Sequence, residues 1–186
     1  MVRETHIEFD KVWNFINSRK NVPAIVQNKD ELGHVFELVK KSEAKTYLEI
    51  GTAEGNSLYA LGGLVESCQI IDLPEKHTQQ AKNEIINILG NVDCFYGDST
   101  KLFPSEDFKK NFDVVMIDGG HDFATVLNDS IRYGDLAKKY IFWHDINLPE
   151  VNLAFEWYVQ RRKYKHYYRF STGPNENFGY GIMEKV

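Results

Sequence analysis

The fold of this chain is decided by one stretch, Tyr47-Leu-Glu-Ile-Gly-Thr-Ala-Glu-Gly-Asn-Ser57. It begins with a short apolar run that ends at Gly51, which is typical of a buried strand running into a turn. A helix is expected to follow from about Asn56 to Glu66, although Gly62 and Gly63 weaken it. The stretch therefore predicts a strand, a glycine-bearing turn and a helix.

The same alternation continues along the chain. Further strands are expected at residues 69–72, 92–96, 112–117 and 140–143, and further helices at about 29–41, 74–90, 123–138 and from 149 onward. Two last strand-like runs, 167–171 and 178–183, flank a turn-rich segment and predict a hairpin. The predicted fold class is α/β, with a seven-stranded mixed sheet, helices on both faces and a C-terminal antiparallel hairpin.

Length and composition restrict the class of protein. The chain has 186 residues and a formal net charge of −5, which argues against a dedicated nucleic-acid-binding protein. It has no run of 18 apolar residues, so no membrane span is expected. Its two cysteines, Cys68 and Cys94, indicate core positions in a reducing compartment, and the first residues lack the apolar core of a signal peptide. We therefore expect a cytoplasmic protein.

Carboxylates recur where the predicted strands end. In an open α/β sheet, ligands bind outside the carboxyl ends of the strands, where the strand order reverses. Any one acid at such a position can be a helix cap or a turn residue, but five in succession favour a binding site. The five are Glu49, Asp72, Asp98, Asp118 and Asp145.

The turn after the first of these strands narrows the choice of ligand. It has neither the lysine of a phosphate-binding loop nor the Gly-x-Gly-x-x-Gly spacing of a dinucleotide site. Gly51 and Gly55 let the backbone approach a ligand, and Asp72, about twenty positions on, suits a ribose diol. Glu49 would repel a pyrophosphate but suits a cation. S-adenosylmethionine meets both demands, because it contains a ribose and carries an ammonium and a sulfonium.

At this point the sequence resembles a known family. Residues 47–57 resemble motif I of class I S-adenosylmethionine-dependent methyltransferases, and Tyr96-Gly-Asp-Ser99 resembles their adenine-binding motif. Ile117-Asp-Gly-Gly-His-Asp-Phe-Ala-Thr-Val-Leu-Asn-Asp129 resembles the signature of a narrower group, the macrocin-type sugar O-methyltransferases and cephalosporin-hydroxylase-like proteins. The resemblance runs from about Val26 to Lys185. It implies a Rossmann-like methyltransferase domain over residues 26–186, preceded by an N-terminal helical extension over residues 1–25.

The resemblance also implies a set of site residues. The cofactor-binding residues would be Glu49, Gly51, Thr52, Gly55, Ser57, Asp72, Asp98, Ser99 and Asp118. A divalent metal, Mg²⁺ or Mn²⁺, would be held by Asp118, His144 and Asp145, and His121 would be the general base. His144 departs from the family pattern, which usually has a carboxylate there, and an imidazole ligand favours Mn²⁺ or Fe²⁺ over Mg²⁺.

These residue types suit methyl transfer to a hydroxyl group. Methyl transfer from a sulfonium is an in-line displacement, and a poorly nucleophilic alcohol needs a base or a metal to take its proton. The leading hypothesis is a metal-assisted O-methyltransferase of a small hydroxylated acceptor, such as a sugar. Three alternatives remain open: a metal-independent methyltransferase of another acceptor class, a non-haem iron hydroxylase, and a degenerate binding module without activity.

The N-terminal segment has a helical pattern of its own. Apolar residues at i, i+3, i+4 and i+7 form one stripe, Phe9, Val12, Trp13 and Ile16. We expect this helix either to cover the mouth of the site or to join a second subunit in a homodimer. After it, Asn28 and Glu31 indicate a capping box, in which Glu31 reaches back to the start of the next helix.

Overall fold

The computed structural model describes residues 8–19, 27–74, 76–102, 108, 111–172 and 178–186. The elements follow one another in the order α1 (Phe9–Ser18), α2 (Lys29–Lys41), β1 (Thr46–Ile50), α3 (Asn56–Gly62), β2 (Ser67–Asp72), α4 (Lys76–Leu89), β3 (Val92–Tyr96), β4 (Phe112–Ile117), α5 (Phe123–Tyr133), the 3₁₀ turn η1 (Gly134–Leu136), β5 (Ala137–His144), α6 (Pro149–Val159), β6 (His166–Phe170) and β7 (Tyr180–Glu184).

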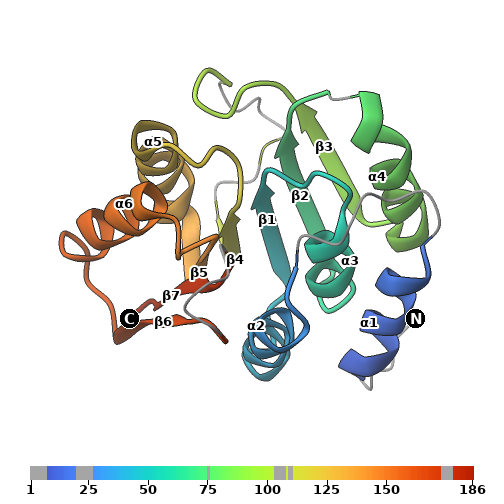
Figure 1. Ribbon diagram of the computed structural model, residues 1–186, viewed down its shortest axis with the longest axis horizontal. Helices are drawn as coiled ribbons and strands as arrows, with labels where there is room; N and C mark the ends of the chain where they lie inside the picture. The colour runs from blue at the N-terminus through green and yellow to red at the C-terminus, as the bar shows by residue number, and fades with distance from the viewer. Residues whose placement is uncertain (1–7, 20–26, 75, 103–107, 109–110, 173–177) are drawn as a thin grey trace.

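One seven-stranded sheet forms the centre of the molecule, in the order β3-β2-β1-β4-β5-β7-β6 (Figure 1). β1 to β5 pair in parallel, whereas β7 runs antiparallel to both β5 and β6. The predicted fold class, with its C-terminal antiparallel hairpin, is confirmed. The strand order reverses between β1 and β4, and that is where a crevice for a ligand is expected.

Helices cover both faces of this sheet. The helices α1 to α4 pack on one face, and α5 and α6 pack on the other (Figure 1). Adjacent residues of β1 point into different layers: Tyr47 belongs to the first cluster of buried side chains and Leu48 to the second. Because both faces are covered, the central strands are mostly apolar, with Glu49 in β1 and Gln69 in β2 as buried polar exceptions.

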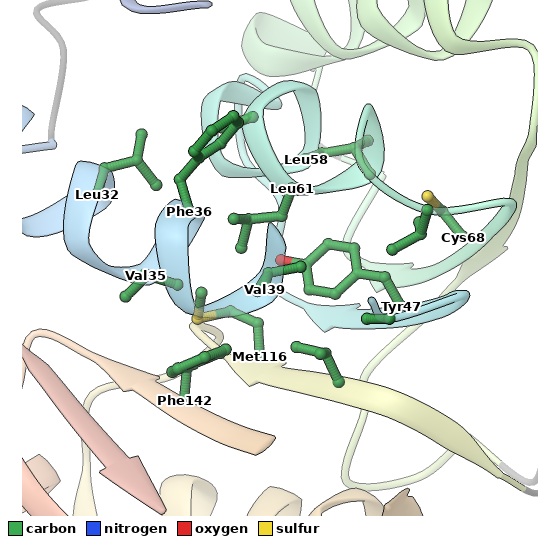
Figure 2. Close-up of a cluster of buried hydrophobic side chains, with 14 of the residues drawn as sticks. Leu32, Val35, Phe36, Val39, Tyr47, Leu58, Leu61, Cys68, Met116 and Phe142 are labelled. Carbon is green, nitrogen blue, oxygen red and sulfur yellow. The ribbon is translucent and has the colours of Figure 1, made fainter. Parts of the chain in front are cut away.

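The core under α2 and α3 shows how the first face is sealed. Phe36 and Val39 of α2 lie with Leu61 of α3 against the sheet residues Met116 and Phe142 (Figure 2). All five side chains are at most 1% exposed. Burial of each such side chain stabilises the fold by about 1.5–3 kcal/mol, so this layer holds the helices firmly over the strands.

The N-terminal helix packs within its own chain. Val12 and Ile16 are buried, and the ring of Phe15 lies 4.3 Å from that of Tyr59 on α3, centroid to centroid. The boundary predicted at residue 25 lies outside the described residues. The division into an extension and a domain stays a prediction, as does the homodimer.

The cap of α2 differs in part from its prediction. Asn28 is the N-cap, and its side-chain oxygen accepts hydrogen bonds from the amides of Asp30 and Glu31. Glu31 does not reach back, because its carboxylate accepts hydrogen bonds from the amide and hydroxyl of Thr172 instead. The capping box is therefore wrong in its second half: a contact across the sequence replaces the local one.

Several helix boundaries also differ from the predicted ones. α3 ends at Gly62 rather than Glu66, and α5 ends at Tyr133 rather than Lys138, because Ala137 already begins β5. In α4, Ile88 is 49% exposed, and the inner face carries Thr78, Lys82, Ile85 and Leu89. Within the described part of the chain, no helix combines the length and apolarity needed to span a membrane.

Candidate functional site

A tight turn, which we call the glycine loop (residues 51–55), leads from β1 into α3. Gly51, Ala53 and Gly55 all have positive φ angles, of 80°, 44° and 83°. A side chain on Gly51 would place its Cβ 2.3 Å from the carbonyl oxygen of Asp118, so only glycine allows β1 and β4 to end this close together. The left-handed conformation of Ala53 is unfavourable for a residue with a side chain, and the surroundings must hold it.

Glu49 lies beneath the glycine loop. It is completely buried, and one of its carboxylate oxygens accepts a hydrogen bond from the Ser57 hydroxyl. Burial raises the pKa of Glu49 to about 8, although the hydrogen bond from Ser57 opposes the shift. Glu49 does not line the cavity described next, so it supports the loop from below. Its predicted contact with the cofactor stays a prediction.

A cavity of about 220 Å³ opens between the glycine loop and the ends of β4 and β5. Its lining includes most of the predicted residues of this region: Gly51, Thr52, Ser57, Asp118, His121, His144 and Asp145, together with Gln27, Ala53, Glu54, Asn56 and Gly119. The Thr52 hydroxyl is buried and has no hydrogen-bond partner among the described residues. A buried hydroxyl of this kind is costly unless a ligand pairs with it.

Two further predicted acids, Asp72 and Asp98, lie where β2 and β3 end and do not line the cavity. We call this part of the sheet edge the adenosine end, after the part of the cofactor predicted to bind there. Asp72 accepts a hydrogen bond from the amide of Leu73, and its other oxygen pairs with the ammonium of Lys82. Lys82 is completely buried, and its Nζ lies 5.5 Å from the centroid of the Tyr96 ring. Sequence reasoning missed Lys82; the signal was a lysine on the inner stripe of α4, where Ile85 and Leu89 follow it.

Asp98 closes its own turn at the adenosine end. Its carboxylate accepts hydrogen bonds from the amide and hydroxyl of Thr100 and from the Lys101 ammonium. The hydrogen bonds from Lys101 and then Thr100 lower the pKa of Asp98 to about 2. The carbonyl of Ser99 accepts hydrogen bonds from Arg132 and Tyr133 of α5. Asp98 and Ser99 are thus held in place, and their contact with adenine stays a prediction.

Four side chains, which we call the acid–imidazole cluster, converge at the ends of β4 and β5: Asp118, His121, His144 and Asp145. Ile117 pairs with Trp143 in the sheet, so the residues that follow them reach the same edge. His144 Nδ1 lies 3.1 Å from Asp118 Oδ1 and 3.4 Å from Asp145 Oδ1. His121 Nε2 lies 2.9 Å from Asp145 Oδ2.

The backbone of Asp145 turns its side chain into this cluster. β5 ends at His144, and Asp145 has a φ of 55°, a left-handed conformation that aspartate tolerates better than most residues. Asn147, two residues further along, donates to the Ser171 hydroxyl and does not line the cavity.

The pKa values within the acid–imidazole cluster depend on one another. Burial alone would lower the pKa of His144, but the Asp118 and Asp145 carboxylates outweigh it and raise the value to about 10. Burial would raise the pKa of Asp145, but hydrogen bonds from His121 and His144 lower it well below its ordinary value. The hydrogen bond to Asp145 raises the pKa of His121. His144 therefore places a positive charge between two negative ones at neutral pH.

The acid–imidazole cluster can also accept a metal ion. One ligand atom each from Asp118, His121 and Asp145 lies within 4.8 Å of the others. Two carboxylate oxygens and one imidazole suit Mg²⁺ or Mn²⁺. His144, the predicted third ligand, is 3% exposed and already binds both carboxylates through Nδ1. His121 thus occupies the place expected of His144, while the ligand role of His144 stays a prediction.

Two further residues of this region were not anticipated from the sequence. Gln27 lines the cavity and accepts a hydrogen bond from the Tyr180 hydroxyl. Arg19, at the end of α1, bonds to the glycine loop. Neither belongs to a recognisable motif, and their partners lie far away along the chain. Four aromatic residues near the C-terminus do not line the cavity: Trp157, Tyr164, Tyr167 and Tyr168.

Comparison with known proteins gives a consistent picture. A family model described as a methyltransferase domain matches residues 48–146. No curated protein matches the chain by sequence. Among solved structures, an O-methyltransferase from Bacillus cereus in complex with S-adenosylhomocysteine is similar, with a TM-score of 0.70, 15% identity, and 96% of this chain and 90% of that chain covered.

Two other solved structures are similar in fold. The O-methyltransferase TomG from Streptomyces achromogenes, involved in tomaymycin synthesis and solved with S-adenosylmethionine, has a TM-score of 0.70 at 13% identity, covering 100% of this chain and 91% of that one. The N-methyltransferase NodS from Bradyrhizobium japonicum has a TM-score of 0.66 at 9% identity, covering 84% and 95%. At these identities the likeness shows the fold alone.

Proposed function

Because this chain belongs to the methyltransferase-domain family, we propose that it transfers a methyl group from S-adenosylmethionine to a hydroxyl group of a small acceptor, such as a sugar. The observation that carries the proposal is the acid–imidazole cluster, which lies at the cavity beside the glycine loop. A site that only binds the cofactor has no need of two imidazoles paired with two carboxylates at this position.

The residues around the cavity fit the cofactor. Asp72 stands where a ribose diol is expected, at the end of β2, and the glycine loop separates it from the acid–imidazole cluster. The unpartnered Thr52 hydroxyl suits the amino-acid part, which carries both an ammonium and a carboxylate. When bound, the cofactor supplies the electrophilic methyl group.

His121 is the proposed general base. Its Nε2 donates to Asp145 in the tautomer that this contact favours, which leaves Nδ1 free to accept a proton from the acceptor hydroxyl. The side chain is 49% exposed, so an incoming acceptor can reach it. Asp145 fixes the ring and stabilises the imidazolium that forms, a division of labour found in other acid–imidazole pairs.

A divalent metal is part of the proposal. Asp118 and Asp145 would hold it, with His121 or His144 as the third ligand, and it would lower the pKa of the acceptor hydroxyl. If His121 binds the metal through Nε2, Asp145 no longer orients it and the metal becomes the main activator. A metal-independent reaction is the second candidate, because the charged His144 already separates the two carboxylates.

Calorimetry with S-adenosylhomocysteine and NAD tests the cofactor assignment. We expect binding of S-adenosylhomocysteine only, weakened by about 1–3 kcal/mol in Asp72→Ala, because ribose hydroxyls lose a charged acceptor. Asp10→Ala, which removes an exposed carboxylate on α1, is the control and should bind normally. Binding of NAD but not of S-adenosylhomocysteine would reject the proposal.

Chelation tests the metal. With metal in the mechanism, excess chelator abolishes methyl transfer but spares binding of S-adenosylhomocysteine, because the ribose and adenine contacts are expected on β1 to β3. Full turnover in chelator would establish the metal-independent candidate.

A further inference from the structure

The guanidinium of Arg19 connects three parts of the fold. Its Nη1 donates to the side-chain oxygen of Asn56 over 2.7 Å, and its Nη2 donates to the carbonyls of Glu54 over 3.0 Å and Ala81 over 2.7 Å. Asn56 begins α3, Glu54 belongs to the glycine loop, and Ala81 lies on α4. The Arg19 side chain is 2% exposed, so solvent does not compete for these bonds.

The hydrogen bonds of Arg19 act on the glycine loop, whose backbone conformation is unfavourable and has to be held by its surroundings. Three of the five residues in the glycine loop have positive φ angles, and Ala53 is unfavourable there. Within the loop, the amide of Gly55 donates to the carbonyl of Thr52 over 2.8 Å. Arg19 adds a hydrogen bond from outside the loop, to the carbonyl of Glu54. Glu54 and Asn56, which Arg19 bonds, both line the cavity.

Only an arginine can make this connection in full. The planar guanidinium presents several N–H donors in a fixed fork, so it can bond two carbonyls and one amide oxygen at once. Lysine would bring a single ammonium on a flexible stem. The position of Arg19 is itself fixed, because the apolar side of α1 is buried through Val12 and Ile16.

We propose that Arg19 is a positioning residue for cofactor binding: it fixes the glycine loop in the shape that receives the amino-acid part of S-adenosylmethionine. This inference rests on the proposed function for the identity of the ligand. It makes α1 a structural component of the site, although the sequence had placed this helix in an extension outside the methyltransferase domain.

The proposal is tested by comparing two ligands, one with the amino-acid part and one without it. We expect Arg19→Met to weaken S-adenosylhomocysteine binding by about 10- to 100-fold and Arg19→Lys to weaken it less. Binding of 5′-methylthioadenosine, which lacks the amino-acid part, should change by less than about twofold in both. Glu84→Gln is the matched control: Glu84 is 3.7 Å from Arg19 Nε and 54% exposed, and its loss leaves the bonds to the loop intact.

Hydrogen exchange gives a readout that needs no ligand. Amides of residues 52–57 should exchange faster in Arg19→Met and Arg19→Lys than in the wild type or Glu84→Gln, while the strand β4 keeps its protection. Unchanged exchange in the loop would overturn the proposal even if the wild type binds S-adenosylhomocysteine. Equal losses for S-adenosylhomocysteine and 5′-methylthioadenosine would also overturn it, because Arg19 would then stabilise the whole domain. A wild type that binds neither ligand would reject the proposed function, and the exchange result would still decide the role of Arg19.

Discussion

The two ends of the crevice neutralise their carboxylates with different cations. At the adenosine end, Asp72 pairs with Lys82 and Asp98 with Lys101. In the acid–imidazole cluster, Asp118 and Asp145 pair with His144, and Asp145 also pairs with His121. A lysine keeps its charge throughout the physiological pH range, and the raised pKa of His144 keeps that imidazole charged as well. His121, which is half-exposed, is the histidine of the cluster that is available to exchange a proton.

This difference corresponds to the two tasks proposed for the site, which are binding of the cofactor and removal of a proton from the acceptor. At the adenosine end, each carboxylate expected to contact the cofactor is paired with a lysine, Asp72 with Lys82 and Asp98 with Lys101. Deprotonation of an acceptor hydroxyl needs a group that changes its charge, and His121 is the group proposed for this step. Four predictions follow from this difference and can each be tested by substitution.

Loss of His121 should have the largest effect. His121→Ala is expected to lower turnover by roughly 10²- to 10⁴-fold, the usual contribution of a general base. The affinity for S-adenosylhomocysteine should stay within about twofold, because the adenosine end is untouched. Single-turnover kinetics and calorimetry on the same preparations provide the measurements. Full turnover in His121→Ala, combined with inactivation by chelator, would assign the activation to a metal alone.

Conversion of His144 to the carboxylate usual in the family should come next. His144→Asp places three carboxylates together and removes the buried cation, so we expect a loss of about 3–5 kcal/mol in unfolding free energy without metal. Mn²⁺ should restore much of this loss by binding between them. His144→Asn, which removes the cation but adds no charge, is the control and should recover less. A His144→Asp protein that is as stable as the wild type without metal would contradict the role of His144 as an internal cation.

The sequence predicted the acid–imidazole cluster better than the adenosine end. Parallel strands bring the residues after Ile117 and Trp143 to one edge of the sheet, so an apolar run followed by an acid is enough to place Asp118 and Asp145. Which nitrogen of which histidine would face them depends on rotamers that the sequence does not encode locally. That His121 joins Asp118 and Asp145 as a possible third ligand, beside the predicted His144, could therefore not be foreseen.

The missed residues have a common physical cause. Arg19 bonds to two backbone carbonyls, which leave no mark in a sequence motif, and to Asn56, 37 positions away. Lys82 lies on the buried stripe of α4, where hydrophobic periodicity would expect an apolar residue and where only the tertiary pairing with Asp72 explains a lysine. Local patterns identified the elements, whereas the cations that organise the site are defined by contacts between them.

A third prediction concerns the pH dependence of stability. The folded-state pKa of Glu49 is raised from 4.5 to about 8, so its stabilising contribution is complete below pH 4.5 and is lost as the pH rises through 8. In Glu49→Gln this loss should disappear. Between pH 5 and pH 8, the free energy of unfolding of the wild type should therefore fall by about 3 kcal/mol relative to that of the variant. Urea unfolding at intervals across this range measures it, and Asp129, whose burial raises its pKa to about 6, is present in both proteins and cancels. Parallel curves for the two proteins would mean that Glu49 is ionised in the fold.

The smallest effects should distinguish the two lysines of the adenosine end. Lys82 is completely buried, so Lys82→Met leaves Asp72 without its cation in a largely desolvated position. The carboxylate then keeps only the amide of Leu73 as a bonded donor and is no longer fixed by the ammonium, and we expect about tenfold weaker binding of S-adenosylhomocysteine. Lys101 is 81% exposed, and Asp98 keeps both hydrogen bonds from Thr100 without it, so Lys101→Met should change the affinity by less than about twofold. Titrations at low and high salt provide a second measure, since screening weakens the exposed pair and hardly affects the buried one. Equal effects of the two substitutions would mean that the burial of the lysine does not decide how much it contributes to cofactor binding.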